Sequence, residues 1–358
     1  MKKSRVLFIC LLALVFILGA CGNNNAPAPS PNQAAPTETP GADTPAPPTG
    51  EVIRLQLGHD NVPGEPLTEA GYFWAERLYE VSGGTMVIDH FHSTALGPRG
   101  GLLDRLFAGD NVLVMAEGGL ATDFGVPDMG ITMGPFLFDT WDQVDRLIES
   151  DLWADLHQQM ADVGMTIVGD NWQYGARSTL SIDRLEGLSD FENLHIRVPN
   201  NSVQVEGMLA LGANPVTMGL GEVYGALQQG VFDAVENPLD VLIAHSLYEP
   251  TNYLLNTRHV FQIHFIVINT DLFNSFTEEQ QRWLVETGRE AGILQNELMM
   301  VAEEEGLRTL EDRGIEIIEL SDETRREFQE AGRWFFTDSS TAASWTPGLF
   351  ERLLEIIN

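Results

Sequence analysis

Residues 196–242 read IRVPNNSVQVEGMLALGANPVTMGLGEVYGALQQGVFDAVENPLDVL, and this stretch decides the fold. The short segments 196–198 and 231–235, rich in Ile, Val and Phe, are typical of strands, whereas 203–211 and 221–229 are typical of helices. Strands that alternate with helices of two to three turns are typical of α/β proteins. The stretch therefore predicts part of an α/β sheet.

The same alternation fills the residues that precede this stretch. Residues 52–57 alternate apolar and polar side chains as a strand does, and 66–81 form an amphipathic helical pattern. Further strands are predicted at 86–88, 112–115 and 165–168, a further helix at 102–107 and a helical stretch at 141–163. This rhythm predicts a sheet with helices on both faces.

After the stretch, two long elements are predicted. The apolar run 260–268 indicates a long strand that crosses between two lobes. Thr277 to Gln280 match a helix N-cap with its capping glutamine or glutamate, and the helix continues to about Arg313. Such a helix is about 50 Å long, enough to lie across two lobes. A last helix is predicted at 349–357.

The N-terminus is predicted to be an export signal. Lys2, Lys3 and Arg5 precede the apolar run 6–18, which is too short for a good membrane span. The run ends Leu-Gly-Ala-Cys, which resembles the lipobox of bacterial lipoproteins. Residues 1–20 are thus predicted to be a lipoprotein signal peptide and Cys21 to be lipidated; an ordinary secretory signal is the alternative. Residues 21–50, rich in Pro, Ala and Asn, are predicted to be a disordered tether.

Charge and cysteine content exclude several classes of function. The chain of 358 residues has 52 acidic residues against 20 Lys plus Arg, a net charge of −32, which disfavours nucleic acid as a partner. Without the leader, every remaining basic residue is arginine. Both cysteines lie in the first 21 residues, so neither a disulfide framework nor a cysteine-based metal site is expected in the main body.

No motif for catalysis or for a cofactor was found. The sequence contains no zinc-protease, serine-hydrolase or phosphate-loop motif, and the glycines from 219 to 225 do not have dinucleotide-binding spacing. His90 and His92 share one face of a predicted strand, but no third metal ligand is spaced to join them. We therefore expect no enzyme activity, no cofactor and no metal, with the two histidines in polar packing.

Several strings occur together in a specific order. They are 196–198 (IRV), 211–215 (LGANP), 222–230 (EVYGALQQG) and 236–239 (ENPL), preceded by 134–138 (GPFLF) and followed by 277–281 (TEEQQ). This combination resembles the solute-binding subunit of tripartite ATP-independent periplasmic (TRAP) transporters, the dicarboxylate-binding-protein family. The resemblance implies a two-lobed periplasmic-binding-protein-like α/β fold, with a ligand cleft between the lobes and a long helix spanning both. Lobe 1 would comprise 51–173 with about 263–302, and lobe 2 would comprise 174–262 with about 303–358.

The resemblance also nominates ligand-binding residues. Arg197 would pair with the ligand carboxylate, because a guanidinium matches a carboxylate with two parallel hydrogen bonds; a structural salt bridge is the alternative. Arg177 corresponds to a second ligand-facing arginine, and Asn237 to an asparagine that hydrogen-bonds the ligand. Glu117 matches a position from which some sugar-acid binders reach across the cleft, with surface acidity as the alternative. Asp60 and Trp172 are further candidates, and Leu220 stands where relatives often carry an aromatic ring.

These features together indicate a lipid-anchored binding protein outside the cytoplasm, facing the periplasm or the extracellular side. It would capture a small carboxylate (dicarboxylate, 2-oxo acid or sugar acid) and deliver it to a transporter driven by an ion gradient. The resemblance implies small and large integral membrane subunits as partners. The alternatives are a ligand sensor that presents its closed form to a receptor, and an exported enzyme; neighbouring permease or kinase genes would distinguish transport from sensing.

Overall fold

The computed structural model describes residues 52–358. The predicted signal peptide (1–20), the lipidated Cys21 and the tether (21–50) lie outside the described residues. No helix within 52–358 combines the length and the apolar character that a membrane span needs.

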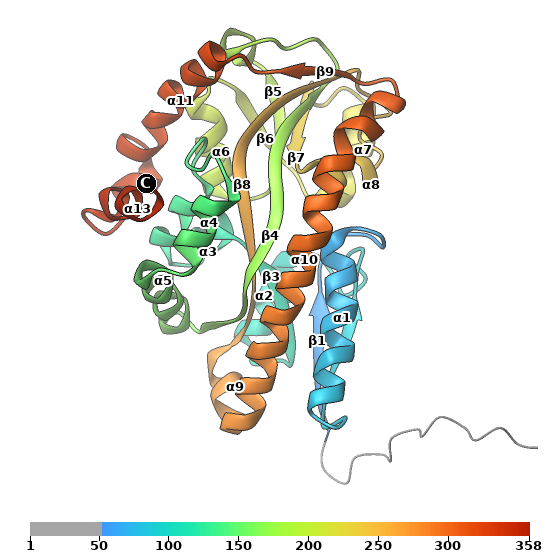
Figure 1. The fold of residues 1–358 in the computed structure, drawn as a ribbon, viewed down its shortest axis with the longest axis vertical. Helices are drawn as coiled ribbons and strands as arrows, with labels where there is room; N and C mark the ends of the chain where they lie inside the picture. The colour runs from blue at the N-terminus through green and yellow to red at the C-terminus, as the bar shows by residue number, and fades with distance from the viewer. Residues whose placement is uncertain (1–51) are drawn as a thin grey trace, which may run out of the picture. The chain divides into compact units, whose positions relative to one another are not determined.

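The described residues are built on a nine-stranded mixed sheet (Figure 1). Along the sheet the strands follow the order β2-β1-β3-β8-β4-β7-β5-β6, and β9 pairs with β8. Strands β1–β3 form one parallel group and β5–β7 another, and the antiparallel pair β4 and β8 joins the two groups. The strands are β1 (Ile53–Gly58), β2 (Met86–Phe91), β3 (Val112–Ala116), β4 (Met165–Ser181), β5 (His195–Val198), β6 (Asn214–Thr217), β7 (Ala234–Asn237), β8 (Tyr253–Asn269) and β9 (Glu316–Glu319).

Strands β4 and β8 are 17 residues long each and run through both halves of the sheet. The prediction of a long crossing strand at 260–268 is confirmed and extends to Tyr253, but the strand predicted at 165–168 is only the first quarter of β4. Nearly every residue of β4 after Asn171 is buried, so the chain has no apolar–polar alternation to reveal a strand. Four register shifts against β8, one of them at Gly175 with φ +137°, also break the pattern.

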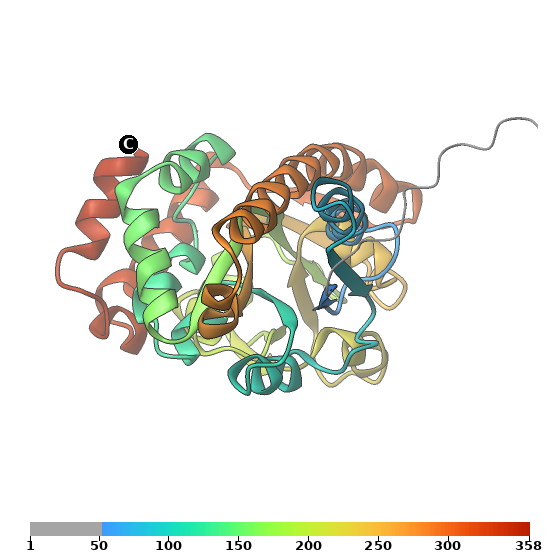
Figure 2. The ribbon, with the colours of Figure 1, turned by 90° about the horizontal axis from the view of Figure 1, so that it is seen from below.

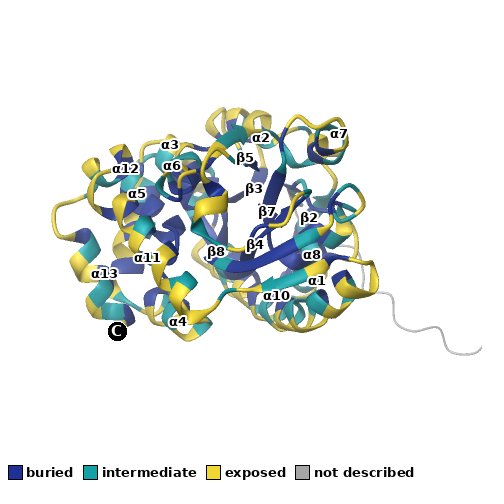
Figure 3. Ribbon diagram, turned by 90° about the horizontal axis from the view of Figure 1, so that it is seen from above, coloured by how far each residue is buried: buried dark blue, intermediate teal, exposed yellow. Residues whose placement is uncertain are grey.

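Helices cover both faces of the sheet, as predicted (Figures 2 and 3). The expected helix 66–81 is confirmed as α1, and its apolar side packs against Leu55, Leu57 and Met115 of the first group of strands. The remaining helices of this region and of the second group are α2 (Arg99–Phe107), α3 (Gly118–Asp123), α4 (Trp141–Ile148), α5 (Asp151–Asp162), α6 (Ser202–Ala210), α7 (Val223–Gln228) and α8 (Leu239–Ala244). A 3₁₀ turn, Leu220–Glu222, precedes α7.

The helical stretch predicted at 141–163 is confirmed, and it is divided into two helices, α4 and α5. Ser150 lies between them in an extended conformation, and its hydroxyl accepts a hydrogen bond from Trp153 N at 3.3 Å. A serine N-cap starts a new helix and ends the old one locally. The apolar periodicity continues across this break because both helices bury residues in one core, with Leu147 from α4 and Leu156 from α5.

The long helix α10 (Glu278–Asp312) has 35 residues and confirms the predicted helix from Thr277 to about Arg313. Thr277 and Gln280 form the predicted capping box. The helix packs on β4 and α1 at its N-terminal part and on α8 and β9 at its C-terminal part, so it spans both lobes. Figure 2 shows α10 and α1 side by side. The short helix α9 (Thr270–Ser275) precedes it.

Gly288 and Gly292 allow α10 to approach β4 closely. A Cβ atom on Gly288 would lie 2.4 Å from the carbonyl oxygen of Val168. We expect Gly288→Ala to destabilise the protein by about 1–3 kcal/mol, because the backbone of β4 or α10 must move. In α7, Gly225→Ala is the matched control, since a Cβ there meets nothing within 4 Å; it should be neutral or stabilising. Urea unfolding measures both, and equal effects in the two variants would contradict the close-packing explanation.

The C-terminal region completes the core on the side of α4 to α6. Helices α11 (Asp322–Thr337), α12 (Ser340–Ala343) and α13 (Leu349–Ile357) bring Phe335, Phe336 and Leu353 into the largest apolar cluster. Phe336 also packs against Gly134, where a Cβ would lie 2.3 Å from its ring. The predicted last helix at 349–357 is confirmed, and α13 packs against α4.

Candidate functional site

Arg197 lies on β5 as a buried cation. Its Nε and Nη2 groups both donate to the carbonyl oxygen of Met218, the former at 2.9 Å, and no carboxylate within 52–358 forms an ion pair with it. The structural salt bridge considered as the alternative for Arg197 is therefore absent from the described residues. Of five N–H groups, the end-on pair on Nη1 and Nη2 stays available, which is the geometry that a carboxylate accepts.

Burial lowers the pKa of Arg197 to about 10, and the positive charges of Arg177 and Arg99 act in the same direction while Glu236 opposes them. The guanidinium remains protonated at neutral pH. A buried cation without a carboxylate partner is costly for the folded protein. An anionic ligand would supply the missing partner.

Arg177 on β4 is held mainly by its own protein. Its Nε and Nη2 groups donate hydrogen bonds to the two carboxylate oxygens of Glu236. Nη2 also donates to the Glu236 carbonyl oxygen at 2.8 Å, and Nη1 donates to Gln262 Oε1 at 2.6 Å. Four of its five N–H groups are thus used. Only one N–H group of Arg177 remains available for the predicted contact with the ligand, because the other four donate to Glu236 and Gln262.

The Glu236 carboxylate is buried, which by itself would raise its pKa. The charge and hydrogen bonds of Arg177, with a further contribution from His259, outweigh burial and lower the pKa of Glu236 to about 2. The Glu236 carboxylate is therefore ionised at every physiological pH.

Asn237 follows Glu236 on β7 and is buried, with its Nδ2 group without a hydrogen-bond partner among the described residues. Strand β7 pairs with β4 on one side, where Asn237 faces Ser178, and with β5 on the other, where Val235 faces Arg197. The three residues Arg177, Arg197 and Asn237 thus stand on adjacent strands, and alternation along β7 places Arg197 and Asn237 on one face of the sheet, whereas Arg177 is bonded to Glu236. A buried donor without a partner has the chemistry to bind a ligand oxygen.

Glu117 and Asp60 both lie close to a third arginine, Arg99, which the sequence analysis missed. Arg99, the first residue of α2, lies 3.6 Å from Asp60 Oδ2 and 3.7 Å from Glu117 Oε1. Glu117 is not a surface acid: it is buried, caps α3 through Leu120 N at 3.0 Å and accepts from Asn201 Nδ2 at 3.2 Å. Arg99 belongs to no sequence motif. The helix that became α2 was predicted to begin at 102, so the sequence analysis did not place Arg99 at a helix N-terminus.

Strands β4 and β8 add a buried polar network between the arginines. Gln262 Nε2 lies within hydrogen-bond distance of His264 Nε2, at 2.9 Å. The His264 and Tyr174 rings are stacked, with their centroids 4.0 Å apart, and the Tyr174 hydroxyl accepts a hydrogen bond from Asn61 Nδ2 at 2.9 Å. These residues were also missed. A signal was available in β8, because Gln262 and His264 are two polar residues on one face of the otherwise apolar segment 260–268.

Two residues predicted to bind the ligand, Trp172 and Leu220, lie among apolar side chains. Trp172 is completely buried, donates from Nε1 to the Gly288 carbonyl oxygen at 3.0 Å and packs against Trp74. Its indole fills the core under α10, and its predicted contact with the ligand stays a prediction. Leu220 is partly buried and packs against apolar clusters on both sides, one with Trp74 and one with Leu227.

His90 and His92 lie in polar packing, as expected, and His59 joins them. The Nε2 atoms of His59 and His90 are 2.6 Å apart, and burial lowers the pKa of both rings, that of His90 to about 4. Tyr72 packs edge-on against His90. Within residues 52–358 no group of histidine, cysteine and acidic side chains is arranged to hold a metal ion.

A second network joins α1 to α8. The buried Glu65 accepts from Val62 N and Asn61, and its Oε1 lies 3.1 Å from His245 Nε2. Burial and the charge of Glu65 raise the pKa of Asp240 to about 8, with Glu303 adding to the effect. Asp240 is therefore protonated in the folded protein at neutral pH.

This shift predicts a pH dependence of stability. An unfolded aspartate titrates near pH 4, so between about pH 4 and 8 the folded state keeps a proton that the unfolded state loses. The contribution of Asp240 to stability is thus complete below pH 4 and is lost as the pH rises to 8. Asp240→Asn has no carboxyl group at this position and so does not lose stability in this way. Its free energy of unfolding in urea, relative to that of the wild type, should rise from pH 5 to 8. Exposed Asp183→Asn is the control, and a pH-independent difference for Asp240→Asn would contradict the shift.

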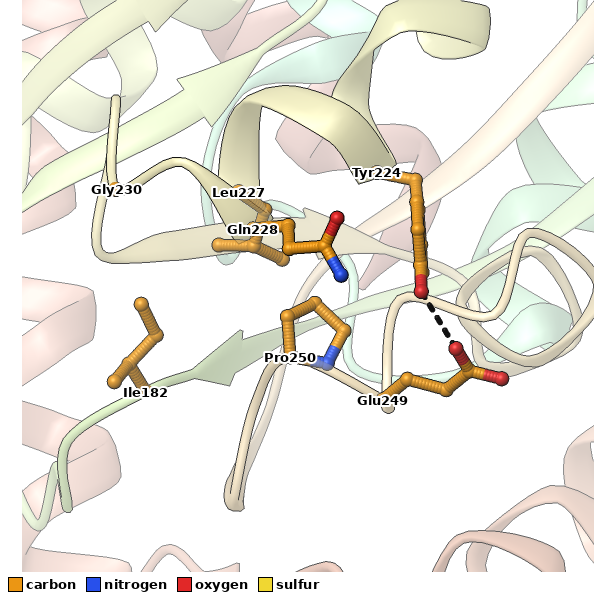
Figure 4. Close-up of a pocket in the computed structure, with 7 residues that line it drawn as sticks. All are labelled: Ile182, Tyr224, Leu227, Gln228, Gly230, Glu249 and Pro250. Carbon is orange, nitrogen blue, oxygen red and sulfur yellow. Dashed lines mark hydrogen bonds between the residues drawn. The ribbon is translucent and has the colours of Figure 1, made fainter.

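The surface also has hollows that involve none of the predicted ligand residues. One, of about 450 Å³, is lined by Ile182, Tyr224, Leu227, Gln228, Gly230, Glu249 and Pro250 (Figure 4). The Tyr224 hydroxyl donates to Glu249 Oε2 at 2.6 Å across it. It has no buried charged group and therefore lacks the character of an acid-binding site.

Comparison with known proteins connects this geometry to a family. The model of bacterial extracellular solute-binding protein family 7 (DctP) matches residues 57–338. The chain is 26% identical over 263 residues to the sialic acid-binding periplasmic protein SiaP of Vibrio cholerae, covering 74% of this chain and 82% of that protein. It is 28% identical over 236 residues to the 2,3-diketo-L-gulonate-binding periplasmic protein YiaO of Escherichia coli, covering 66% and 68%.

Among solved structures, a TRAP periplasmic solute-binding protein from Ochrobacterium anthropi with bound L-fuconate has a TM-score of 0.81 and 28% identity, covering 86% of this chain and 100% of that one. The two-lobed α/β fold with a long helix spanning both lobes is thereby confirmed. The chain belongs to family 7 of the bacterial extracellular solute-binding proteins, the family of the TRAP transporter binding subunits.

Proposed function

We propose that this protein captures a small organic acid between its two lobes and delivers it to an ion-gradient-driven membrane transporter with one small and one large integral subunit. The observation that carries the proposal is Arg197, a buried cation whose end-on N–H pair has no protein partner among the described residues. The unpartnered Asn237 Nδ2 and one N–H of Arg177 would complete the site for a carboxylate.

The relatives support an acid as ligand. SiaP and YiaO are named for sialic acid and 2,3-diketo-L-gulonate, and the Ochrobacterium anthropi structure holds L-fuconate. All three are carboxylic acids, so the same chemistry is proposed here: a dicarboxylate, a 2-oxo acid or a sugar acid.

We further propose that the lobes, 51–173 with about 263–302 and 174–262 with about 303–358, close over the ligand. Cys21 would carry a lipid that anchors the protein to the outer face of the cell membrane, and 21–50 would serve as the tether. Incorporation of a labelled fatty acid in the wild type and its loss in Cys21→Ala would support the anchor. Label retained in that variant would contradict it.

The proposal is tested by the thermal stability of the purified protein against small organic acids, with amino acids and neutral sugars as controls. A ligand that binds only the folded state adds about 2.7 kcal/mol at a hundredfold excess over its Kd. We expect one class of acid to stabilise the protein and Arg197→Ala to remove the effect. Stabilisation by a neutral sugar alone, or by an acid equally in Arg197→Ala, would overturn the proposal.

A further inference from the structure

Between Arg282 and Glu311, most of the exposed residues of the long helix α10 lie along one line. We call this line the outer stripe, and its members are Arg282, Glu286, Arg289, Ile293, Glu297, Met300, Glu304, Arg308 and Glu311. They follow one another at steps of three or four residues, and the spacing repeats after 11 residues, so the stripe runs nearly straight along the helix. Figure 2 shows α10 on the outside of the molecule, next to α1. The outer stripe is therefore open to another molecule.

The centre of the outer stripe is apolar. Ile293 and Met300, with the adjacent Val301, are 55%, 60% and 55% exposed, the highest values among the large apolar side chains within 52–358. They lie within little more than two turns of one helix. Apolar side chains that are exposed together, with charged residues on both sides, are typical of a contact surface rather than of scattered surface residues.

The charges of the outer stripe are complementary to the same charges in reversed order. When the stripe is read inwards from its two ends, each arginine corresponds to a glutamate and the two apolar residues correspond to each other. The pairs are Arg282 with Glu311, Glu286 with Arg308, Arg289 with Glu304 and Ile293 with Met300, and each is centred at or beside Glu297. A contact between two identical surfaces about a two-fold axis has this property, because residue i meets residue j of the other copy and j meets i.

We propose that the outer stripe is a contact between two copies of this chain, with their α10 helices antiparallel about a two-fold axis at Glu297. The apolar centres cover each other, and the arginines on either side pair with glutamates of the second copy. Lobe 1 of each copy lies beside lobe 2 of the other, because α10 packs on β4 and α1 at one end and on α8 and β9 at the other. None of the candidate ligand residues belongs to α10, so this inference is independent of the proposed function.

Two of the arginines are held only loosely within their own chain. Arg282 lies 3.7 Å from a Glu279 oxygen and 3.9 Å from a Glu286 oxygen, and Arg308 lies 3.7 Å from a Glu305 oxygen. These distances exceed hydrogen-bond length, and exposed ion pairs along one helix contribute little to stability. Their guanidinium N–H groups therefore remain available for carboxylates of a second copy.

A hollow beside the outer stripe gives room for side chains of the second copy. It has a volume of about 390 Å³, and α10 contributes Val301 and Glu305 to its lining. Through the centre at Glu297, these two positions correspond to Ile293 and Arg289. The apolar part of the lining therefore suits Ile293 of the second copy, and the acidic part, to which Glu69 also belongs, suits Arg289 of that copy.

The test is sedimentation equilibrium of the purified protein, with Cys21→Ala so that no lipid contributes to association. Each chain has a formal net charge of −32, so the measurement needs physiological salt, where a Debye length of about 8 Å screens the charges far from the contact. We expect a reversible monomer–dimer equilibrium in the micromolar range. A protein that is still monomeric at about 1 mM would overturn the proposal.

Two single variants act on the centre of the contact. Met300→Glu should weaken the dimer about tenfold or more, because it places a charge against Ile293 of the second copy. Glu297→Gln should strengthen the dimer severalfold, because the two Glu297 carboxylates repel each other at the axis. On α6, Leu209→Glu is the matched control, since Leu209 is 48% exposed, and its Kd should equal that of the parent protein. Equal weakening by Met300→Glu and Leu209→Glu would contradict the assignment to α10.

Reversal of one charge pair tests the antiparallel register. Arg282→Glu and Glu311→Arg should each weaken the dimer severalfold, because each puts two like charges together at both ends of the contact. The double variant restores opposite charges and should associate more tightly than either single variant. Urea unfolding of the monomers shows whether all variants are folded, and neither position is buried. A folded double variant that associates no more tightly than the weaker single variant would overturn the two-fold pairing.

Discussion

Arg197→Lys should weaken acid binding at least tenfold, and Arg197→Ala by about 100-fold or more. Each charge-assisted hydrogen bond contributes about 1.5–3 kcal/mol, and the end-on guanidinium fork makes two of them. Lysine keeps the charge but loses the planar pair of donors, so only part of the interaction survives. Isothermal titration with the acid that stabilises the wild type measures both variants, and a lysine variant within threefold of the wild type would contradict bidentate binding.

Stability of the ligand-free protein separates this effect from misfolding. The lowered pKa of Arg197 means that the folded protein disfavours its charged form. Arg197→Met should therefore fold at least as stably as the wild type in urea while it loses binding. A variant that loses binding and stability together would indicate that Arg197 has a structural role instead.

Arg177→Met should have the opposite signature, a loss of about 3–5 kcal/mol of folding free energy. The variant leaves Glu236 as a buried carboxylate without its guanidinium, and an uncompensated buried charge is destabilising by that amount. The exposed Arg184, paired with Glu186 and Glu316, offers the matched control. Arg184→Met should cost less than about 1 kcal/mol, because exposed ion pairs contribute little.

The pH dependence of the Arg177→Met effect follows from Glu236. In the wild type the pKa of Glu236 is about 2, below that of an unfolded glutamate near 4.3, so its stabilising contribution is complete above about pH 4.3 and is lost as the pH falls towards 2. Without Arg177, burial dominates and the folded state prefers the protonated acid. The deficit of the variant should therefore shrink as the pH is lowered from 7 to 4. A deficit that stays constant over this range, or one as small as that of Arg184→Met, would contradict the ion-pair explanation.

Elements with a strong local signal were predictable from the sequence. The bounds of α1 agree because its apolar residues recur at helical spacing and Pro66 starts it. The 35-residue α10 agrees because Thr277 and Gln280 define its start. Strand β4 was mostly missed because it is buried on both faces and bulged, and such strands lack the alternation by which strands are recognised.

Only those residues of the candidate site that the family resemblance points to could be predicted from the sequence. Arg197 and Asn237 stand in strings whose order resembles the family, and the structure places them, with Arg177, on the adjacent strands β5, β7 and β4. The sequence did not reveal that Glu236 occupies the Arg177 fork, because 52 acidic residues offer many partners. Arg99 was missed for a similar reason, since its two carboxylates lie 39 and 18 residues away in the chain. The packing of Trp172 under α10 had no local signal either, because α10 begins more than 100 residues later in the sequence.

The most direct test of the account is a crystal structure of the protein with the acid that stabilises it most. We predict the ligand carboxylate on the Nη1 and Nη2 groups of Arg197, with one of its oxygens accepting from Asn237 Nδ2 and with Arg177 still paired to Glu236. An acid bound elsewhere, or bound with its carboxylate away from Arg197, would contradict the central claim that this buried cation is the carboxylate site.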